Sequence, residues 1–267
     1  MPESFPKIAP NAQRVLLVND DGIEATGLKL LEEIVRGFTD DVWVVAPDEE
    51  KSGASHSLSL TLPVRVRRID DRHFAIKGTP TDCALLAIYE LMSEQKPTVL
   101  LSGINRGANL AEDVTYSGTA AAAMEGALLG IRAIALSQVF TIGGEAHWET
   151  ARRYTAPVLE KLLTCDWEPG SFVSVNFPDV TPDAVSGIRV TTQGRRRPGS
   201  FRPTRRVDAR NFPYYWIELA YQNGELESGT DLHAIAENAV SVTPMQLDLT
   251  AHAFRRYLDQ RFKGQGA

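Results

Sequence analysis

The sequence predicts an α/β fold in which a mostly parallel sheet is covered by helices on both faces. Two observations carry this prediction. Short runs of β-branched residues and leucine, such as Arg14–Asn19, are typical of strands that are buried on both faces. They alternate with segments such as Gly27–Phe38, whose apolar residues recur with helical spacing. After Pro178 this alternation gives way to a β-rich C-terminal extension.

The remaining elements of the predicted core follow in chain order. Asp41–Pro47 is a second strand that ends at its proline, and Ser57–Ile76 has the alternation of two or three short strands. The later elements are a helix at Thr79–Met92 capped by Thr79 or Thr81, a strand at Thr98–Leu101, a helix at Thr119–Leu129, a strand at Ala133–Ser137, a helix at Ala146–Leu163 and a strand at Phe172–Asn176.

The extension contains an arginine-rich segment between two predicted strands, Gly187–Thr192 and Pro213–Ala220. A solvated, flexible loop is the leading interpretation of this segment, Gly194–Arg206, and steering of anionic substrates is the alternative. The predicted elements that follow are a helix at Asp231–Asn238, a strand at Val240–Thr243 and an amphipathic helix at Ala251–Phe262. We expect a single domain over residues 1–267, with a core at about 14–178 and an extension at about 179–267.

Composition narrows the class of protein. A net charge of -6 argues against nonspecific binding of nucleic acid or of an anionic membrane surface. Cys83 and Cys165 have no metal-type spacing and suggest no disulfide framework. No apolar run reaches the length of about 18 residues that a membrane span needs. Met1–Gln13 lacks the pattern of a signal peptide, so we expect a cytoplasmic protein.

Polar side chains follow three of the predicted strands at the point where each strand ends. Asp20 and Asp21 come directly after the first strand, Ser52 follows the second, and Asn105 follows Thr98–Leu101. Because the carboxyl ends of parallel strands share one edge of a sheet, we expect these groups to meet there. Carboxylate, hydroxyl and amide oxygens suit a hard divalent cation such as Mg²⁺, Mn²⁺ or Ca²⁺, and they do not suit zinc.

Each of these residues also has an ordinary structural explanation. A single acid would favour a helix N-terminus, Ser52 would be a loop serine, and Asn105 would occupy a turn. Two adjacent acids, however, repel one another, and a bound cation relieves that repulsion. We therefore favour the metal site for Asp20 and Asp21.

A second candidate subsite lies at the start of the alanine-rich helix. Ser117, Gly118 and Thr119 form a turn whose N–H and hydroxyl groups can bind phosphate, although an ordinary capped helix begins in the same way. The loop that contains Asn109 joins this turn to Asn105, so metal and phosphate subsites would be neighbours. That combination is what phosphoryl chemistry requires, and we expect Asn109 and the turn to bind phosphate.

Motifs occur in order along nearly the whole chain: Val18-Asn19-Asp20-Asp21-Gly22, Ala46-Pro47-Asp48 with Ser52-Gly53, Gly78-Thr79-Pro80-Thr81-Asp82, Ser102-Gly103-Ile104-Asn105-Arg106-Gly107-Ala108-Asn109-Leu110, Asp113-Val114-Thr115-Tyr116-Ser117-Gly118-Thr119, Ser174-Val175-Asn176-Phe177-Pro178 and Ser241-Val242-Thr243-Pro244. Together they are highly specific, and in them the chain resembles the SurE family of survival-protein phosphatases. Two positions depart from the usual pattern, since Ala111 stands where glycine is common and Ala120 where valine is common.

The resemblance implies a Rossmann-like core and a cytoplasmic, metal-dependent hydrolase, a 5′-nucleotidase that acts on nucleoside 5′-monophosphates. Some members also accept 3′-monophosphates or exopolyphosphate. By motif position, Asp20, Asp21, Ser52 and Asn105 would hold one divalent cation per subunit, Mg²⁺ or Mn²⁺. The resemblance further implies a homodimer or homotetramer in which C-terminal segments are exchanged.

The resulting hypothesis is phosphomonoester hydrolysis, in which Asp20 and Asp21 are the catalytic residues. Water would attack phosphorus directly, or an aspartyl-phosphate intermediate would form, and the sequence leaves both routes open. One rival is a phosphoacceptor signalling module, which also places paired acids after its first strand. The other is a noncatalytic binder of nucleotides or nucleic acid that uses the arginine-rich segment, a possibility that the overall acidity disfavours.

Overall fold

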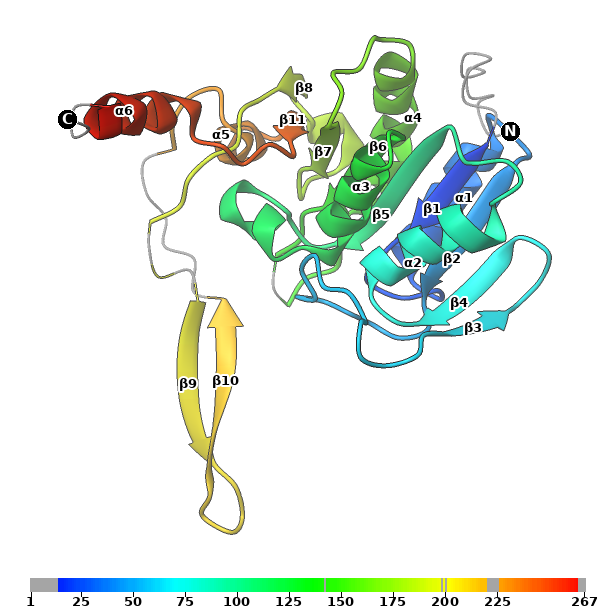
Figure 1. Ribbon diagram of the computed structural model, residues 1–267, viewed down its shortest axis with the longest axis horizontal. Helices are drawn as coiled ribbons and strands as arrows, with labels where there is room; N and C mark the ends of the chain where they lie inside the picture. Colours follow the sequence, from blue (N-terminus) through cyan, green and yellow to red (C-terminus); the bar gives the residue numbers. More distant parts are fainter. Residues whose placement is uncertain (1–13, 142, 198, 200, 220–225, 264–267) are drawn as a thin grey trace.

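The computed structural model describes residues 14–141, 143–197, 199, 201–219 and 226–263, so Met1–Gln13 lies outside the described residues. Within them, the centre of the molecule is a nine-stranded sheet with the order β3-β4-β2-β1-β5-β6-β7-β11-β8 (Figure 1). Neighbouring strands run parallel except in the pairs β3–β4 and β7–β11. The predicted α/β architecture with a mostly parallel sheet is therefore confirmed.

The strands of this sheet are short, as expected for an α/β core. Their bounds are Val15–Val18 (β1), Val42–Pro47 (β2), Arg65–Arg68 (β3), His73–Lys77 (β4), Val99–Arg106 (β5), Arg132–Gln138 (β6), Ser171–Phe177 (β7), Gly187–Val190 (β8) and Ala239–Gln246 (β11).

One face of the sheet is covered by α1 (Thr26–Arg36) and α4 (Trp148–Leu163), whose apolar residues join Leu17 of β1 in one buried cluster. The spacing of the apolar residues in α1 gives this helix a single buried stripe, as the sequence predicts. Leu16 of β1 points to the opposite face and belongs to a second buried cluster. Both faces of the central strands are thus removed from water, which explains their continuous apolar sequences.

The second face is covered by α2 (Pro80–Leu86) and α3 (Gly118–Leu128), which contribute small buried residues. Thr79 caps α2 in a capping box with Asp82, and the predicted helix beyond Leu86 continues as a π-helical turn, η1, at Ala87–Leu91. The buried alanines of α3 let this helix lie close to the sheet.

Strand β5 extends five residues further than Thr98–Leu101, through Arg106, with a register shift against β6 between Ser102 and Asn105. Gly103 makes this path possible because its φ is 128° and a Cβ there would lie 2.3 Å from the carbonyl oxygen of Leu136. The irregular end of β5 carries Asn105 to the edge of the sheet.

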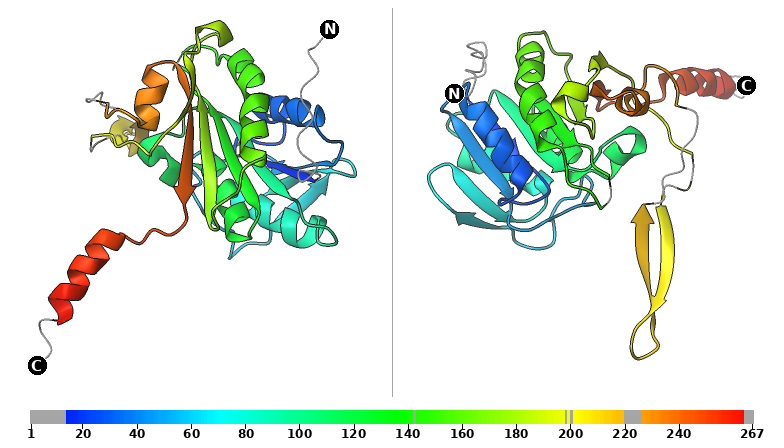
Figure 2. Two further views of the ribbon diagram at one scale, coloured as in Figure 1. Left: turned by 90° about the horizontal axis from the view of Figure 1, so that it is seen from above. Right: turned by 180° about the vertical axis from the view of Figure 1, so that it is seen from behind.

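The C-terminal extension contributes β8 and β11 to the main sheet and forms a separate hairpin from β9 (Phe201–Val207) and β10 (Pro213–Leu219). This hairpin and α6 (His252–Lys263) project from the body of the molecule (Figures 1 and 2). The interpretation of Gly194–Arg206 as a flexible loop is wrong for its last part, because residues 201–207 pair with β10 along their whole length. The boundary near residue 178 stays a prediction.

The remaining helical elements of the described residues are short. The short helix α5 spans Asp231–Ala236, and two 3₁₀ turns, η2 and η3, span Ala111–Thr115 and Pro182–Ala184. Of the predicted strand region Ser57–Ile76, only β3 and β4 form strands. Ala220, the predicted end of β10, lies outside the described residues.

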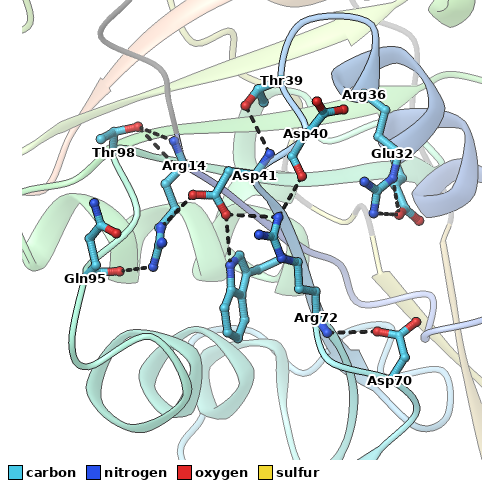
Figure 3. A network of polar contacts seen from close by, with 11 residues as sticks. Arg14, Glu32, Arg36, Thr39, Asp40, Asp41, Asp70, Arg72, Gln95 and Thr98 are labelled. Carbon is cyan, nitrogen blue, oxygen red and sulfur yellow. Dashed lines mark hydrogen bonds and ion pairs between the residues drawn. The ribbon is translucent and has the colours of Figure 1, made fainter.

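A network of charges covers the amino-terminal edge of the sheet, opposite to the strand ends that carry the candidate site (Figure 3). Asp41 precedes β2 and pairs with Arg14 at 2.9 Å and with Arg72 at 3.1 Å. The indole Nε1 of Trp43 donates a hydrogen bond to the same carboxylate at 3.2 Å. The carboxylate of Asp41 therefore has two partners of opposite charge.

Candidate functional site

A cavity of about 640 Å³ lies at the carboxyl-terminal edge of the central strands. Three of the predicted site residues line it: Asp20, which follows β1, Ser52, which follows β2, and Asn105, the last but one residue of β5. Asn109 and Ser117 line the same cavity. The fold thus brings together residues that are far apart in the sequence, as the rule for parallel sheets predicts.

Asp20 is held in place by the beginning of α3. The hydroxyl of Thr119 donates a hydrogen bond to Oδ1 of Asp20 at 2.5 Å. Gly118 packs against the same side chain so closely that a Cβ at this position would lie 2.8 Å from the Cβ of Asp20. Burial raises the pKa of Asp20 to about 6, and the charge of Asp21 adds to that effect while the Thr119 hydrogen bond opposes it.

Asp21 differs from Asp20 in its surroundings. It is not among the residues that line the cavity, and its Oδ2 accepts a hydrogen bond from the backbone N–H of Arg106 at 3.0 Å. Burial raises the pKa of this carboxyl as well, and the nearby charge of Glu50 acts in the same direction. In the part of the chain that the structure describes, neither Asp20 nor Asp21 forms an ion pair with a basic side chain.

The two neutral candidates each make one local hydrogen bond. The hydroxyl of Ser52 donates to Oε1 of Glu50 at 2.8 Å. The Nδ2 group of Asn105 donates to the carbonyl oxygen of Gly107 at 3.0 Å, so the Oδ1 atom points away from that contact. Both side chains therefore keep oxygen lone pairs for a further partner.

This donor set fits a hard divalent cation. A buried carboxylate next to a partly buried one, with no basic side chain in an ion pair with either, favours a positive ion, and a hydroxyl and an amide oxygen can complete its coordination. No group of three or more histidine, cysteine, aspartate or glutamate residues among the described residues could hold a metal ion. A site here would consequently depend on Ser52 and Asn105 in addition to the two acids.

Of the predicted phosphate-binding residues, Asn109 is fixed by two residues that the sequence analysis did not select. Its Nδ2 donates to the hydroxyl of Ser137 at 2.9 Å, and its backbone N–H donates to Oδ1 of Asn176 at 2.9 Å. Asn176 also donates to the carbonyl oxygen of Asn109 at 3.1 Å. Both partners lie on β6 and β7 near the strand ends, so the rule that selected Asp20 would also have pointed to them.

The turn at the start of α3 has structural duties besides any phosphate contact. The hydroxyl of Ser117 accepts a hydrogen bond from the backbone N–H of Ala120 at 3.0 Å and caps the helix. Thr119 is fully buried against Asp20, and neither Thr119 nor Gly118 lines the cavity. Ser117 and the N–H groups of the first helical turn are the parts that can reach an anion.

The arginine-rich segment also contributes to this cavity. Arg196 lines it, pairs with Asp113 at 2.8 Å and donates a hydrogen bond to the carbonyl oxygen of Leu110 at 2.8 Å. Its side chain is only 10 % exposed, so the interpretation as a solvated loop is wrong at this residue as well. Because the acid that pairs with Arg196 lies 83 positions earlier in the sequence, no local pattern could have predicted that this arginine is buried.

In the described part of the chain, none of the helices combines the length and the apolar character that crossing a bilayer requires.

Comparisons with known proteins match the chain along most of its length. A family model described as "Survival protein SurE" matches residues 15–200. A relative from Methylobacterium sp. (strain 4-46), named 5′-nucleotidase SurE, is 53% identical over 239 residues, which cover 89% of this chain and 94% of the relative. The 5′-nucleotidase SurE of Parvibaculum lavamentivorans is 49% identical over 246 residues, covering 91% of this chain and 89% of the relative. The crystal structure of the SurE protein from Aquifex aeolicus superposes with a TM-score of 0.79 at 37% identity, covering 92% of this chain and 99% of that one.

Proposed function

The chain belongs to the SurE family of 5′-nucleotidases, and we propose that it hydrolyses nucleoside 5′-monophosphates to nucleoside and phosphate with one divalent cation. The observation that carries this proposal is the surroundings of Asp20. Its carboxylate is buried, lies next to a second acid and shares a cavity with the oxygen donors Ser52 and Asn105. A cation binding there would remove the cost of burying like charges.

Each residue of the site has a role in this reaction. Asp20, Asp21, Ser52 and Asn105 would hold Mg²⁺ or Mn²⁺. When bound, such an ion neutralises phosphate oxygens and lowers the pKa of a coordinated water. Thr119 keeps the carboxylate of Asp20 oriented, so that it can orient the attacking water and accept its proton.

Phosphate recognition falls to the other side of the cavity. Asn109, fixed by Asn176 and Ser137, presents a rigid amide, and Ser117 presents the first N–H groups of α3. Preorganised donors of this kind need no rearrangement as charge develops on the phosphoryl oxygens. Nucleoside 3′-monophosphates and exopolyphosphate carry the same terminal group, and we include them as further substrates of this site.

We also propose that the protein is cytoplasmic and assembles into a homodimer or homotetramer through its C-terminal arms. The hairpin exposes Tyr215, Trp216 and Ile217 to solvent, and an isolated two-stranded hairpin is marginally stable without a partner. Replacing Trp216 by Asp should lower the mass measured by light scattering to that of a smaller assembly. An unchanged mass would refute this mode of assembly.

The enzymatic proposal is tested by measuring phosphate release from AMP with Mg²⁺ or Mn²⁺, then with excess chelator, then after the metal is restored. Activity should disappear with the chelator and return with the ion. Turnover that resists the chelator would refute the metal site, whereas absence of turnover with every mononucleotide and every divalent ion would refute the nucleotidase itself.

A further inference from the structure

The catalytic cavity continues beyond Asp20 into an aromatic region that the reaction described above does not use. Tyr116, Phe140 and Phe201 line the same cavity as Asp20. A phosphate that contacts Ser117 would leave the rest of a nucleotide to occupy this region. The question is which of the three rings can receive a base.

Phe140 already has a partner on its ring. The guanidinium of Arg106 lies over it, 4.4 Å from the ring centroid, at the distance of a cation–π contact. Tyr116 and Phe201 instead contact each other edge to face, with ring centroids 4.9 Å apart and an angle of 68° between the planes. They remain 50% and 40% exposed, so a large part of both rings is available to a ligand.

The position of Tyr116 relative to the phosphate subsite supports a role in nucleotide binding. Tyr116 directly precedes Ser117, the N-cap of α3. Its backbone is anchored at both ends, because its N–H donates to the carbonyl oxygen of Asp113 at 2.9 Å and its carbonyl oxygen accepts from Ser55 at 3.1 Å. One residue of rigid chain therefore separates an aromatic ring from the site where the phosphate would bind.

Arg195 and Arg197 line a neighbouring pocket with the two rings but do not line the catalytic cavity, whereas Arg196 lines both. Arg196 binds Asp113 at 2.8 Å and the carbonyl oxygen of Leu110 at 2.8 Å. A base placed against Tyr116 and Phe201 would thus be held by stacking, and stacking tolerates every base because each has a π-face.

We propose that Tyr116 and Phe201 form the nucleobase platform of this enzyme and that the platform accepts purine and pyrimidine nucleotides alike. This inference rests on the proposed nucleotidase function and names the part of the substrate that the aromatic region recognises. Phe201 is also the first residue of β9, so the platform joins the core of the enzyme to its projecting hairpin.

The test compares substrates with and without a base. Kinetics of Tyr116→Ala and Phe201→Ala are measured with AMP, CMP and ribose 5-phosphate. Losing a stacking ring should raise KM for AMP and CMP roughly tenfold and change kcat/KM for ribose 5-phosphate by less than about twofold. Tyr116→Phe keeps the ring and should retain wild-type KM values. Phe212→Ala removes an exposed aromatic ring of the hairpin outside the cavity and serves as the matched control.

Two results would overturn the platform: unchanged KM for AMP in both alanine variants, or an equal loss with ribose 5-phosphate, which would indicate a structural role. Binding of AMP and of ribose 5-phosphate, measured by titration calorimetry, separates this inference from the nucleotidase proposal. Selective weakening of AMP binding in Tyr116→Ala without any turnover by the wild type would support the platform and refute the nucleotidase.

Discussion

The two edges of the central sheet treat charge in opposite ways. At the amino-terminal edge, Asp41 binds two arginines and an indole N–H (Figure 3). At the carboxyl-terminal edge, Asp20 and Asp21 are adjacent, Asp20 accepts a hydrogen bond from a hydroxyl, and Asp21 accepts one from the backbone N–H of Arg106, whose charge is also close. The first arrangement compensates the charge of Asp41, whereas the second places two like charges next to each other with Asp20 buried.

This difference separates the part of the sheet that stabilises the fold from the part that we propose binds the ligand. Opposite charges in contact favour the folded state even where solvent screens them in part. Like charges close together disfavour the folded state, and such an arrangement is typical of sites where a bound ligand offsets the repulsion. The comparison therefore predicts that substitutions at the two edges have opposite effects on stability, and that only those at the carboxyl-terminal edge lower activity.

The largest effect is expected for Asp20→Asn. The substitution removes one of the two carboxylates that we propose hold the metal, while the amide oxygen can still accept the hydrogen bond from Thr119. Phosphate release from AMP should fall more than about 100-fold, because even the partners that orient metal ligands contribute 10- to 100-fold. Mn²⁺ should raise the melting temperature of the wild type and leave that of the variant unchanged.

Asp48→Asn is the matched control, since Asp48 is an exposed acid just beyond β2 that does not line the cavity. Its activity should stay close to that of the wild type. Comparable activity in Asp20→Asn and Asp48→Asn would refute the assignment of Asp20.

The next effect concerns the stability of the metal-free protein as a function of pH. Burial raises the pKa of Asp20 from 3.8 to about 6, so the folded state holds its proton more tightly than the unfolded state does. The resulting stabilisation is complete below pH 3.8 and is lost as the pH rises through about 6, and the shift corresponds to about 3 kcal/mol.

Denaturant titrations in chelator at several pH values measure this dependence. In Asp20→Asn the same contribution is absent, so the variant should be more stable than the wild type at pH 7 and lose less stability between pH 4 and pH 7. If the wild type loses no more stability than Asp20→Asn between pH 4 and pH 7, the proposed burial of charge is contradicted.

At the opposite edge, Asp41→Ala should act on stability alone. It leaves Arg14 and Arg72 without their carboxylate and should cost about 1–2 kcal/mol, an effect that salt reduces because these groups are partly exposed. Chemical denaturation at low and high salt measures the loss. Phosphate release from AMP should stay at the wild-type level under conditions where the variant is folded, and a specific loss of activity would break the distinction between the two edges.

The smallest effect is expected at Ala111, the first residue of the 3₁₀ turn η2 beside the cavity. Ala111 has a φ of 51°, and its backbone N–H and carbonyl oxygen are held by Asp231 and Gln193 at 2.8 Å each. Ala111→Gly should relieve the left-handed strain, offset in part by a more flexible unfolded chain, for a net gain below about 1 kcal/mol. The denaturation midpoint reports this gain, and a clear loss of stability would show that the alanine methyl group contributes more than its strain costs.

Most of the core elements could be predicted from local patterns, whereas the assignment of the site residues stays a prediction. Alternating apolar runs and helical spacing indicated β1, α1, β2 and α4 because such patterns depend on neighbouring residues alone. Strand β10 was predicted, but β9 was missed because arginines dominate Phe201–Val207 and conceal the strand. Its formation depends on pairing with β10, which no local composition shows.

The sequence by itself determined the chemistry available at the edge of the sheet: adjacent carboxylates after the first strand, a serine after the second, and an asparagine and a capped turn further on. Only the tertiary structure decided which of these groups contact one another. Thr119 contacts Asp20, which lies 99 positions earlier in the chain, and Asn176 contacts Asn109, which lies 67 positions earlier. Phe201, at the start of the projecting hairpin, contacts Tyr116 in the core. Such contacts depend on strand order and on the path of the chain between strands, and those are properties of the whole fold.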